Sequence, residues 1–159
     1  MSRTILAIRH GKPELPSEHD DILGPHLTRE AKNDIINLRA NEPRFAQGIG
    51  IMAVSSTWRS METAELLGAT TLLPKSVLRE LTPSLPVEEL RAMAAAHRAP
   101  REFIDAGLDV LARLTEATDK CVVHGWNGMG ILGAVEEVGG THDAPSLLVP
   151  NLGIVEFTF

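Results

Sequence analysis

The sequence predicts an α/β fold, a three-layer sandwich in which a mostly parallel central sheet is flanked by helices. Short aliphatic runs at residues 4–8, 51–54 and 121–123 alternate with stretches of helical periodicity. Continuous apolar runs are typical of buried parallel strands, and strand–helix alternation is typical of a sheet covered on both faces. The chain has 159 residues, of which 43% are hydrophobic, so we expect a single domain over residues 1–159.

Helix start and stop signals bound the expected helices. Thr28 has the hydroxyl of an N-cap, Gly68 follows a periodic stretch where a glycine commonly ends a helix, and Pro86 suits a first turn. The expected helices cover residues 28–40, 58–67, 86–96, 101–117 and 127–138.

Two further extended segments are expected, at residues 72–78 and, as a last strand that closes the sheet, at 153–159. In α/β sheets, ligands bind just beyond the carboxyl ends of the parallel strands. Three polar clusters occupy equivalent places after strands and should meet at that edge: Arg9-His10-Gly11, Ser55 to Arg59, and His124-Gly125.

Charge and cysteine content argue against several classes of protein. Lys plus Arg is 15 and Asp plus Glu is 21, so the formal net charge is −6. This balance speaks against a nucleic-acid-binding surface and against binding to anionic membranes, and no stretch reads as a membrane span. A single cysteine, Cys121, allows no intramolecular disulfide, and no signal peptide is recognisable. We therefore expect a cytoplasmic protein with an inert core cysteine.

The residue types expected at the sheet edge predict a phosphate clamp. Arg9 and Arg59 offer planar pairs of N–H donors that match phosphate oxygens. The helix N-termini that follow the strands add backbone donors. A neutral imidazole can attack phosphorus, and two nearby guanidiniums disfavour its protonation. His10 is thus a candidate nucleophile, and His124 can share the charge of the bound phosphate.

Taken singly, each of these residues also fits an ordinary role. A histidine at a strand end commonly lies on a polar rim, an arginine that opens a helix is commonly solvated, and Glu80 fits any surface carboxylate. Their coincidence at one sheet edge favours a site. For other residues the ordinary interpretation is favoured. His19, Asp20, Asp21 and His26 could ligate a metal but have no recognised spacing, and His97 and His142 are interpreted as surface residues. Trp58 and Trp126 are expected to pack in the core or at its rim, with substrate contact as the alternative.

Arg9-His10-Gly11 at the end of the first strand resembles the signature of the histidine phosphatase (phosphoglycerate-mutase-like) superfamily. Further features follow in that family's order, so the resemblance spans nearly the whole chain. They are Leu27–Ala31 at the first-helix opening, Ser55–Ala64 as an SS-x-x-x-R-x-x-x-T-A segment, Leu78-Arg79-Glu80 as the stretch that carries an acid, and Val122–Gly125 as the strand that bears a second histidine.

The resemblance implies roles for these residues. His10 would be the phosphorylated nucleophile, and Glu80 the general acid for the leaving oxygen and then the base for water. The phosphoryl group would be bound by Arg9, Arg59, His124, Gly11 and Gly125. The resemblance implies no metal and no organic cofactor.

Departures from the family pattern narrow the class. Residues 81–86 lack the Gly/Glu-Gly pattern that mutases and bisphosphatases carry after the acid, and the insert before Cys121 is only about two helices long. We therefore do not expect mutase activity. The short chain resembles the small bacterial phosphohistidine phosphatases, although Pro25-His26 replaces a basic residue common in that branch.

Three functions stay open at this point. The first is hydrolysis of a small phosphomonoester through a phosphohistidine on His10. The second is a phosphohistidine protein phosphatase in signalling, and the third is a non-catalytic phosphate-binding module. The expected partner is a phosphorylated small molecule or a phosphoprotein. The acidic loop after His10, with Glu14, Glu18, Asp20 and Asp21, predicts a preference for substrates of low negative charge.

Overall fold

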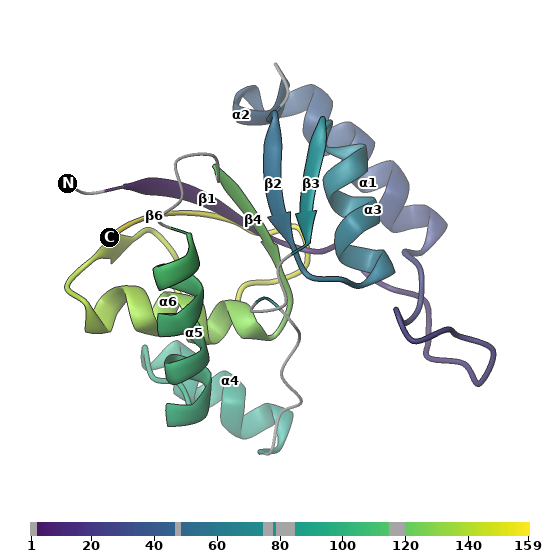
Figure 1. Ribbon diagram of the computed structural model, residues 1–159. Coiled ribbons are helices and arrows are strands. Elements are labelled where there is room, and N and C mark those ends of the chain that lie inside the picture. The colour runs from purple at the N-terminus through teal and green to yellow at the C-terminus, as the bar shows by residue number, and fades with distance from the viewer. Residues whose placement is uncertain (1–2, 47–48, 75–77, 79–84, 115–119) are drawn as a thin grey trace.

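A computed structural model describes residues 3–46, 49–74, 78, 85–114 and 120–159 (Figure 1). Within them, strands and helices alternate as the sequence predicts. In chain order the elements are β1 (Thr4–Arg9), α1 (Arg29–Asn41), α2 (Pro43–Ala46), β2 (Ile51–Val54), α3 (Trp58–Leu66), β3 (Thr71–Pro74), α4 (Val87–Ala95), α5 (Arg101–Arg113), β4 (Cys121–His124), α6 (Asn127–Glu137), β5 (Thr141–His142) and β6 (Ile154–Thr158).

The six strands form one sheet in the order β3-β2-β4-β1-β6-β5. The first four in this order pair in parallel, whereas β6 runs antiparallel to β1 and β5 antiparallel to β6. The sheet is therefore mostly parallel, as predicted, with an antiparallel edge. β1 lies inside it, between β4 and β6, so both flanks of the strand that leads to His10 are hydrogen-bonded.

Two hydrophobic clusters cover the two faces of the sheet and give the three layers. Ile5 and Ala7 of β1 pack with buried side chains of α4, α5 and α6. Ile8 of the same strand packs with side chains of α1, α2 and α3 on the opposite face. This alternation is the period of two that a β-strand imposes. Figure 1 shows the two helix groups on opposite sides of the sheet.

The predicted helix ends are largely confirmed. The Thr28 hydroxyl accepts a hydrogen bond from the Ala31 amide at 3.0 Å, which makes it the N-cap of α1. Gly68 follows α3 with a φ of +90°, a conformation that favours glycine. Pro86 lies at the N-cap of α4 and not within its first turn. Helix α5 ends at Arg113, earlier than predicted, and the predicted stretch 115–117 lies outside the described residues.

Helices α5 and α6 pack closely because each has a glycine at their contact, Gly107 in α5 and Gly130 in α6. A Cβ atom on Gly130 would lie 2.0 Å from the Phe103 carbonyl oxygen, and one on Gly107 of α5 would lie 2.1 Å from the Gly130 carbonyl oxygen. Each glycine costs a helix about 1 kcal/mol relative to alanine. Packing of the two backbones offsets this cost and fixes α6, which begins directly after the His124 strand end.

The structure also bears on two other expectations from the sequence, the state of the Cys121 thiol and the presence of membrane-spanning segments. Burial raises the pKa of the Cys121 thiol to about 12, in keeping with an inert core cysteine. Across the part of the chain that the structure describes, no helix has both the length and the apolar character needed to cross a bilayer.

Candidate active site

The structure brings the two predicted imidazoles to neighbouring strand ends. Arg9 of β1 lies opposite His124 of β4 in the parallel register, and the His10 amide donates to the His124 carbonyl oxygen at 2.9 Å. Both histidines are buried, with 5% and 1% of their surface exposed. Because these strands end at the same edge, the sequence prediction that His10 and His124 lie together is confirmed.

Each imidazole is oriented by the carbonyl of the glycine that follows it. His10 Nδ1 lies 2.7 Å from the Gly11 oxygen, and His124 Nδ1 lies 3.1 Å from the Gly125 oxygen. A carbonyl oxygen only accepts, so each Nδ1 must carry the proton. In the neutral ring the lone pair then lies on Nε2. Both rings therefore have the tautomer in which Nε2 is the nucleophilic or accepting atom.

A buried threonine joins the His10 turn to the helix that carries Arg59. The Gly11 amide donates to Thr63 Oγ1 at 3.1 Å, and that hydroxyl donates to the Arg59 carbonyl oxygen at 2.7 Å. Thr63 is fully buried. The turn at His10 and the first turn of α3 are thus held together through a single hydroxyl.

On the His124 side, the linking residue is Asn127. Its Oδ1 accepts from the Gly125 amide at 2.8 Å, and its Nδ2 donates to the Leu78 carbonyl oxygen, also at 2.8 Å. Asn127 and Leu78 are both buried. Leu78 precedes Glu80 by two positions; the predicted acid itself lies outside the described residues. The amide bonds tie the His124 turn to the segment that leads to that acid.

The glycines of the site contribute their carbonyl oxygens and their small size more than their amide N–H groups. The amides of Gly11 and Gly125, both predicted to bind phosphate, already donate within the protein. Their carbonyls orient the two imidazoles. A third glycine, Gly128, makes room for a ring, because a Cβ atom there would lie 2.1 Å from His124 Nδ1. Sequence reasoning missed Gly128, Asn127 and Thr63, although Thr63 stands within the SS-x-x-x-R-x-x-x-T-A segment.

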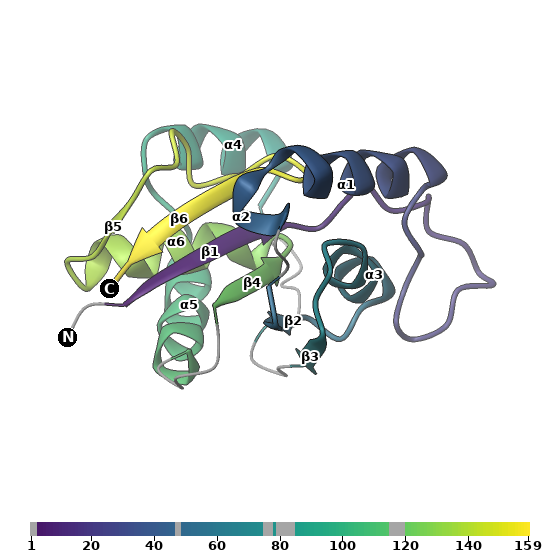
Figure 2. The same cartoon turned by 90° about the horizontal axis from the view of Figure 1, so that it is seen from above.

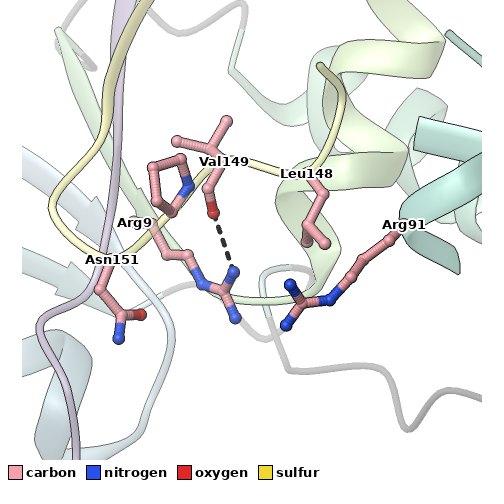
Figure 3. Close-up of a pocket in the computed structure, with 6 residues that line it drawn as sticks. Arg9, Arg91, Leu148, Val149 and Asn151 are labelled. Atoms are coloured by element: carbon pink, nitrogen blue, oxygen red, sulfur yellow. Dashed lines mark hydrogen bonds between the residues drawn. The ribbon is translucent and has the colours of Figure 1, made fainter. Parts of the chain in front are cut away.

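Arg9 is the last residue of β1 and directly precedes His10. Its Nη1 donates to the Val149 carbonyl oxygen at 2.8 Å, and its guanidinium lies 5.2 Å from the centroid of the Trp126 ring. The side chain lines a cavity of about 340 Å³ together with Arg91 (Figure 3). Trp126 therefore makes a cation–π contact with Arg9, in addition to the packing role predicted for this tryptophan.

The loop between β1 and α1 is fastened to α3 beside Arg59. Trp58 Nε1 donates to the Asp21 carboxylate at 2.9 and 3.0 Å, and its ring stacks on His26 with centroids 5.0 Å apart. A Cβ atom on Gly24 would lie 3.0 Å from Arg59 Nη1, so the loop backbone passes next to that guanidinium. Figures 1 and 2 show the loop extending away from the sheet past α3. Asp21 and His26 thus have structural partners.

Among the described residues, one group has the composition of a metal site, and it lies away from the imidazole pair. Glu136 Oε1 is 2.7 Å from His97 Nδ1 and 2.8 Å from His142 Nε2. The prediction that His142 is a surface residue is wrong, since its side chain is only 4% exposed. Its Nδ1 accepts from the Ala144 amide at 3.1 Å, so Nε2 carries the proton and donates to Glu136. This tautomer favours a hydrogen-bond network over metal ligation.

Protonation within this network is shifted. The hydrogen bond to Glu136 raises the pKa of His97 above its ordinary value. Burial raises the pKa of Glu136, but hydrogen bonds from His97 and His142 outweigh it, so the pKa lies below its ordinary value. A charged His97–Glu136 pair therefore links the end of α4 to α6.

Comparison with known proteins gives matches at the level of structure. No protein-family model matches the sequence, and no curated protein does. A protein from Agrobacterium tumefaciens assigned as the phosphohistidine phosphatase SixA matches with 12% identity and a TM-score of 0.55 over 96% of this chain and 89% of its own. The phosphoserine phosphatase of Entamoeba histolytica matches with 18% identity and a TM-score of 0.59 over 96% and 89%.

A third match covers a larger share of the matched protein than the first two do. A mycobacterial glucosyl-3-phosphoglycerate phosphatase has 18% identity and a TM-score of 0.60 over 97% of this chain and 92% of its own. All three carry the fold that the Arg9-His10-Gly11 resemblance implied, and each match covers almost the whole chain. The protein therefore has the phosphoglycerate-mutase-like fold of the histidine phosphatase superfamily.

Proposed function

We propose that the protein is a histidine phosphatase that hydrolyses a phosphomonoester through a phosphohistidine on His10. The observation that carries the proposal is the pair of buried imidazoles at the ends of β1 and β4, each with Nδ1 bonded to the next glycine carbonyl. A ring fixed in this tautomer directs a nucleophilic Nε2 at a bound phosphoryl group. The phosphatase names of the matched structures support the same function.

The reaction has two displacement steps. In the first, His10 Nε2 attacks phosphorus, the P–O bond to the leaving group breaks, and the leaving oxygen takes a proton from Glu80. In the second, water attacks the phosphohistidine, the P–N bond breaks, and Glu80 takes a proton from the water. Inorganic phosphate leaves, and His10 regains its lone pair. No metal is required at either step.

The cations of the site stabilise the charge that spreads over the phosphoryl oxygens in both steps. Arg59 lies on the first turn of α3, and its backbone is fixed to the Gly11 turn through Thr63. His124 carries the second imidazole. The Ser55 hydroxyl, at the end of β2, is buried and has no hydrogen-bond partner among the described residues. A phosphoryl oxygen would satisfy this donor.

A second candidate, a phosphohistidine protein phosphatase, is favoured by the loop beside Arg59. This loop exposes Ile22 completely and Leu15 to 87%. Exposed apolar side chains near a site commonly serve contact with a protein, and a small metabolite does not require them. For either substrate we place the enzyme in the cytoplasm, on the basis of its single buried Cys121.

The test combines two substrates with two histidine variants. We expect turnover of p-nitrophenyl phosphate or of a phosphohistidine peptide, unchanged by a chelator, and an acid-labile phosphoenzyme after rapid quenching. His10→Ala should remove the phosphoenzyme and lower kcat by at least about 10³-fold. His19→Ala, a histidine that is 88% exposed in the loop, is the matched control and should behave as wild type. A phosphoenzyme signal that persists in His10→Ala would exclude His10 as the nucleophile.

A further inference from the structure

The loop between β1 and α1 is closed at its base and bonded to α3 at two further points. At the base, an isolated β-bridge joins the two ends of the loop. The Leu27 amide donates to Glu62 Oε1 at 3.0 Å, and farther along the loop the Leu23 carbonyl accepts from the Trp58 amide at 3.1 Å. Trp58 precedes Arg59 and Glu62 follows it within one turn of α3. The loop is therefore fixed against the part of the helix that carries this cation.

Asp21 closes a four-residue turn within this loop, residues 21–24, which we call the Asp21 turn. The Asp21 carbonyl oxygen accepts from the Gly24 amide at 3.0 Å, which is the hydrogen bond of a β-turn. The Asp21 carboxylate accepts from the Leu23 amide at 2.9 Å and, at 2.9 and 3.0 Å, from Trp58 Nε1. One residue thus fixes the conformation of the turn and joins the turn to α3.

Gly24 brings the backbone of the Asp21 turn next to the Arg59 guanidinium. Its φ of +81° lies in the left-handed region that favours glycine. A Cβ atom at this position would lie 3.0 Å from Arg59 Nη1, so the turn leaves room for the guanidinium only while residue 24 has no side chain. An arginine side chain has many rotamers, and a neighbour that restricts them in advance lowers the entropy cost of binding a phosphate. The turn therefore limits the positions that the Arg59 guanidinium can take.

We propose that the Asp21 turn positions the Arg59 guanidinium for the phosphoryl group, with Asp21 and Gly24 as the positioning residues. This inference rests on the proposed phosphatase function, in which Arg59 binds that group. Neither positioning residue touches the substrate in this proposal; both act through Arg59.

The charge of Asp21 makes the proposal testable by the sign of an effect. A carboxylate beside a phosphate site repels the anion, so removal of its charge alone would strengthen anion binding. If Asp21 positions Arg59, its removal frees the turn and weakens anion binding instead. Charge and position therefore predict opposite results for the same substitution.

The first experiment compares two glycines that have the same backbone conformation. Gly139 has a φ of +80°, and no described atom lies within 4 Å of a Cβ atom built there. Gly24→Ala and Gly139→Ala should lower Tm by similar amounts, because a left-handed φ disfavours alanine in both. Only Gly24→Ala displaces the Arg59 guanidinium. We expect it to raise the inhibition constant of inorganic vanadate about tenfold, as the loss of a charged hydrogen bond would, whereas Gly139→Ala keeps the wild-type constant.

The second experiment separates position from charge. Asp21→Ala and Glu18→Ala each remove one negative charge from the same loop, and Glu18 is 88% exposed. We expect the inhibition constant of vanadate to rise about fivefold in Asp21→Ala and to stay at or below the wild-type value in Glu18→Ala. Asp21→Asn keeps an acceptor oxygen for Trp58 Nε1 and the Leu23 amide. It should therefore restore the constant to within about twofold of wild type although the charge is gone.

The outcomes separate this inference from the proposed function. If Gly24→Ala inhibits like wild type, or if Gly139→Ala shows the same rise, the turn does not position Arg59. If Asp21→Ala binds vanadate as tightly as wild type or more tightly, Asp21 acts through its charge alone and the inference is wrong. In each of these cases turnover of p-nitrophenyl phosphate by wild type leaves the phosphatase function standing. A wild-type protein that binds no vanadate by calorimetry and hydrolyses neither p-nitrophenyl phosphate nor a phosphohistidine peptide would refute the function itself.

Discussion

The Thr63 hydroxyl offers a sharp test of how the site is held together. It accepts from the Gly11 amide at 3.1 Å and donates to the Arg59 carbonyl at 2.7 Å, and the side chain is fully buried. Thr63→Val preserves the shape of the side chain and removes both bonds. Thr63→Ser preserves the hydroxyl and removes one methyl group. The two variants therefore separate hydrogen bonding from packing.

The expected magnitudes follow from burial. The Gly11 amide left without an acceptor in Thr63→Val costs about 1–3 kcal/mol of unfolding free energy. Thr63→Ser loses the burial of one methyl group, about 0.8 kcal/mol. The larger contrast should be in catalysis, because a displacement of about 1 Å in a reacting group can lower the rate by about 10²-fold. We expect kcat to fall by that factor in Thr63→Val and to stay within about threefold of wild type in Thr63→Ser.

Urea unfolding and steady-state turnover of p-nitrophenyl phosphate measure these effects on the same protein samples. The reasoning is refuted if Thr63→Val keeps wild-type kcat, or if the valine and serine variants lose activity equally. In either case the Thr63 hydroxyl would not position the His10 turn.

Two other predictions concern the second imidazole and the distant histidine network. Gly128→Ala places a methyl group 2.1 Å from His124 Nδ1, so the ring must move and kcat should fall about 10²-fold. Gly133→Ala on the same helix, where the closest atom is 3.1 Å away, should retain activity, and equal activity of the two variants would contradict the role of Gly128. The lowered pKa of Glu136 stabilises the folded protein at pH values above 4.5, the ordinary pKa of this group. This stabilisation is lost as the pH falls through the pKa of Glu136 in the folded protein. The stability from the raised pKa of His97 is complete below its ordinary value of 6.5 and is lost as the pH rises through the folded value. The difference in Tm between wild type and Glu136→Gln should therefore be largest between pH 4.5 and 6.5, and a constant difference from pH 4 to 9 would rule out this pair.

The parallel part of the fold could be predicted because buried strands leave a local pattern. The run Ile51–Val54 coincides with β2, since an uninterrupted apolar segment between a turn and a hydroxyl cluster fits a strand covered on both faces. The antiparallel pairing of β6 beside β1 depends on contacts between the two ends of the sequence, which no local pattern records. β5 has only two residues, and α2 only four, so neither is long enough to show a periodicity.

Site residues that directly follow a strand could be predicted from the sequence. Contacts between side chains from distant parts of the chain could not. His10 and His124 follow apolar strands, so the sheet-edge rule places them together. Asn127 reads as an ordinary helix-opening residue until the Gly125 amide and the Leu78 carbonyl are located beside it. His97 and His142 look unrelated in sequence and meet only because α4 and β5 pack near the end of α6. The role of Glu80 stays a prediction.

The position of β1 has a consequence for how the enzyme is made. The strand that leads to His10 is synthesised before both strands that flank it, residues 121–124 and 154–158. A ribosome-bound chain that has completed every described helix still lacks β6, one of the two neighbours of β1. The sheet around β1 is therefore complete only after β6 has left the exit tunnel, and nascent chains interrupted before that point carry every predicted active-site residue but leave one edge of β1 without its partner strand.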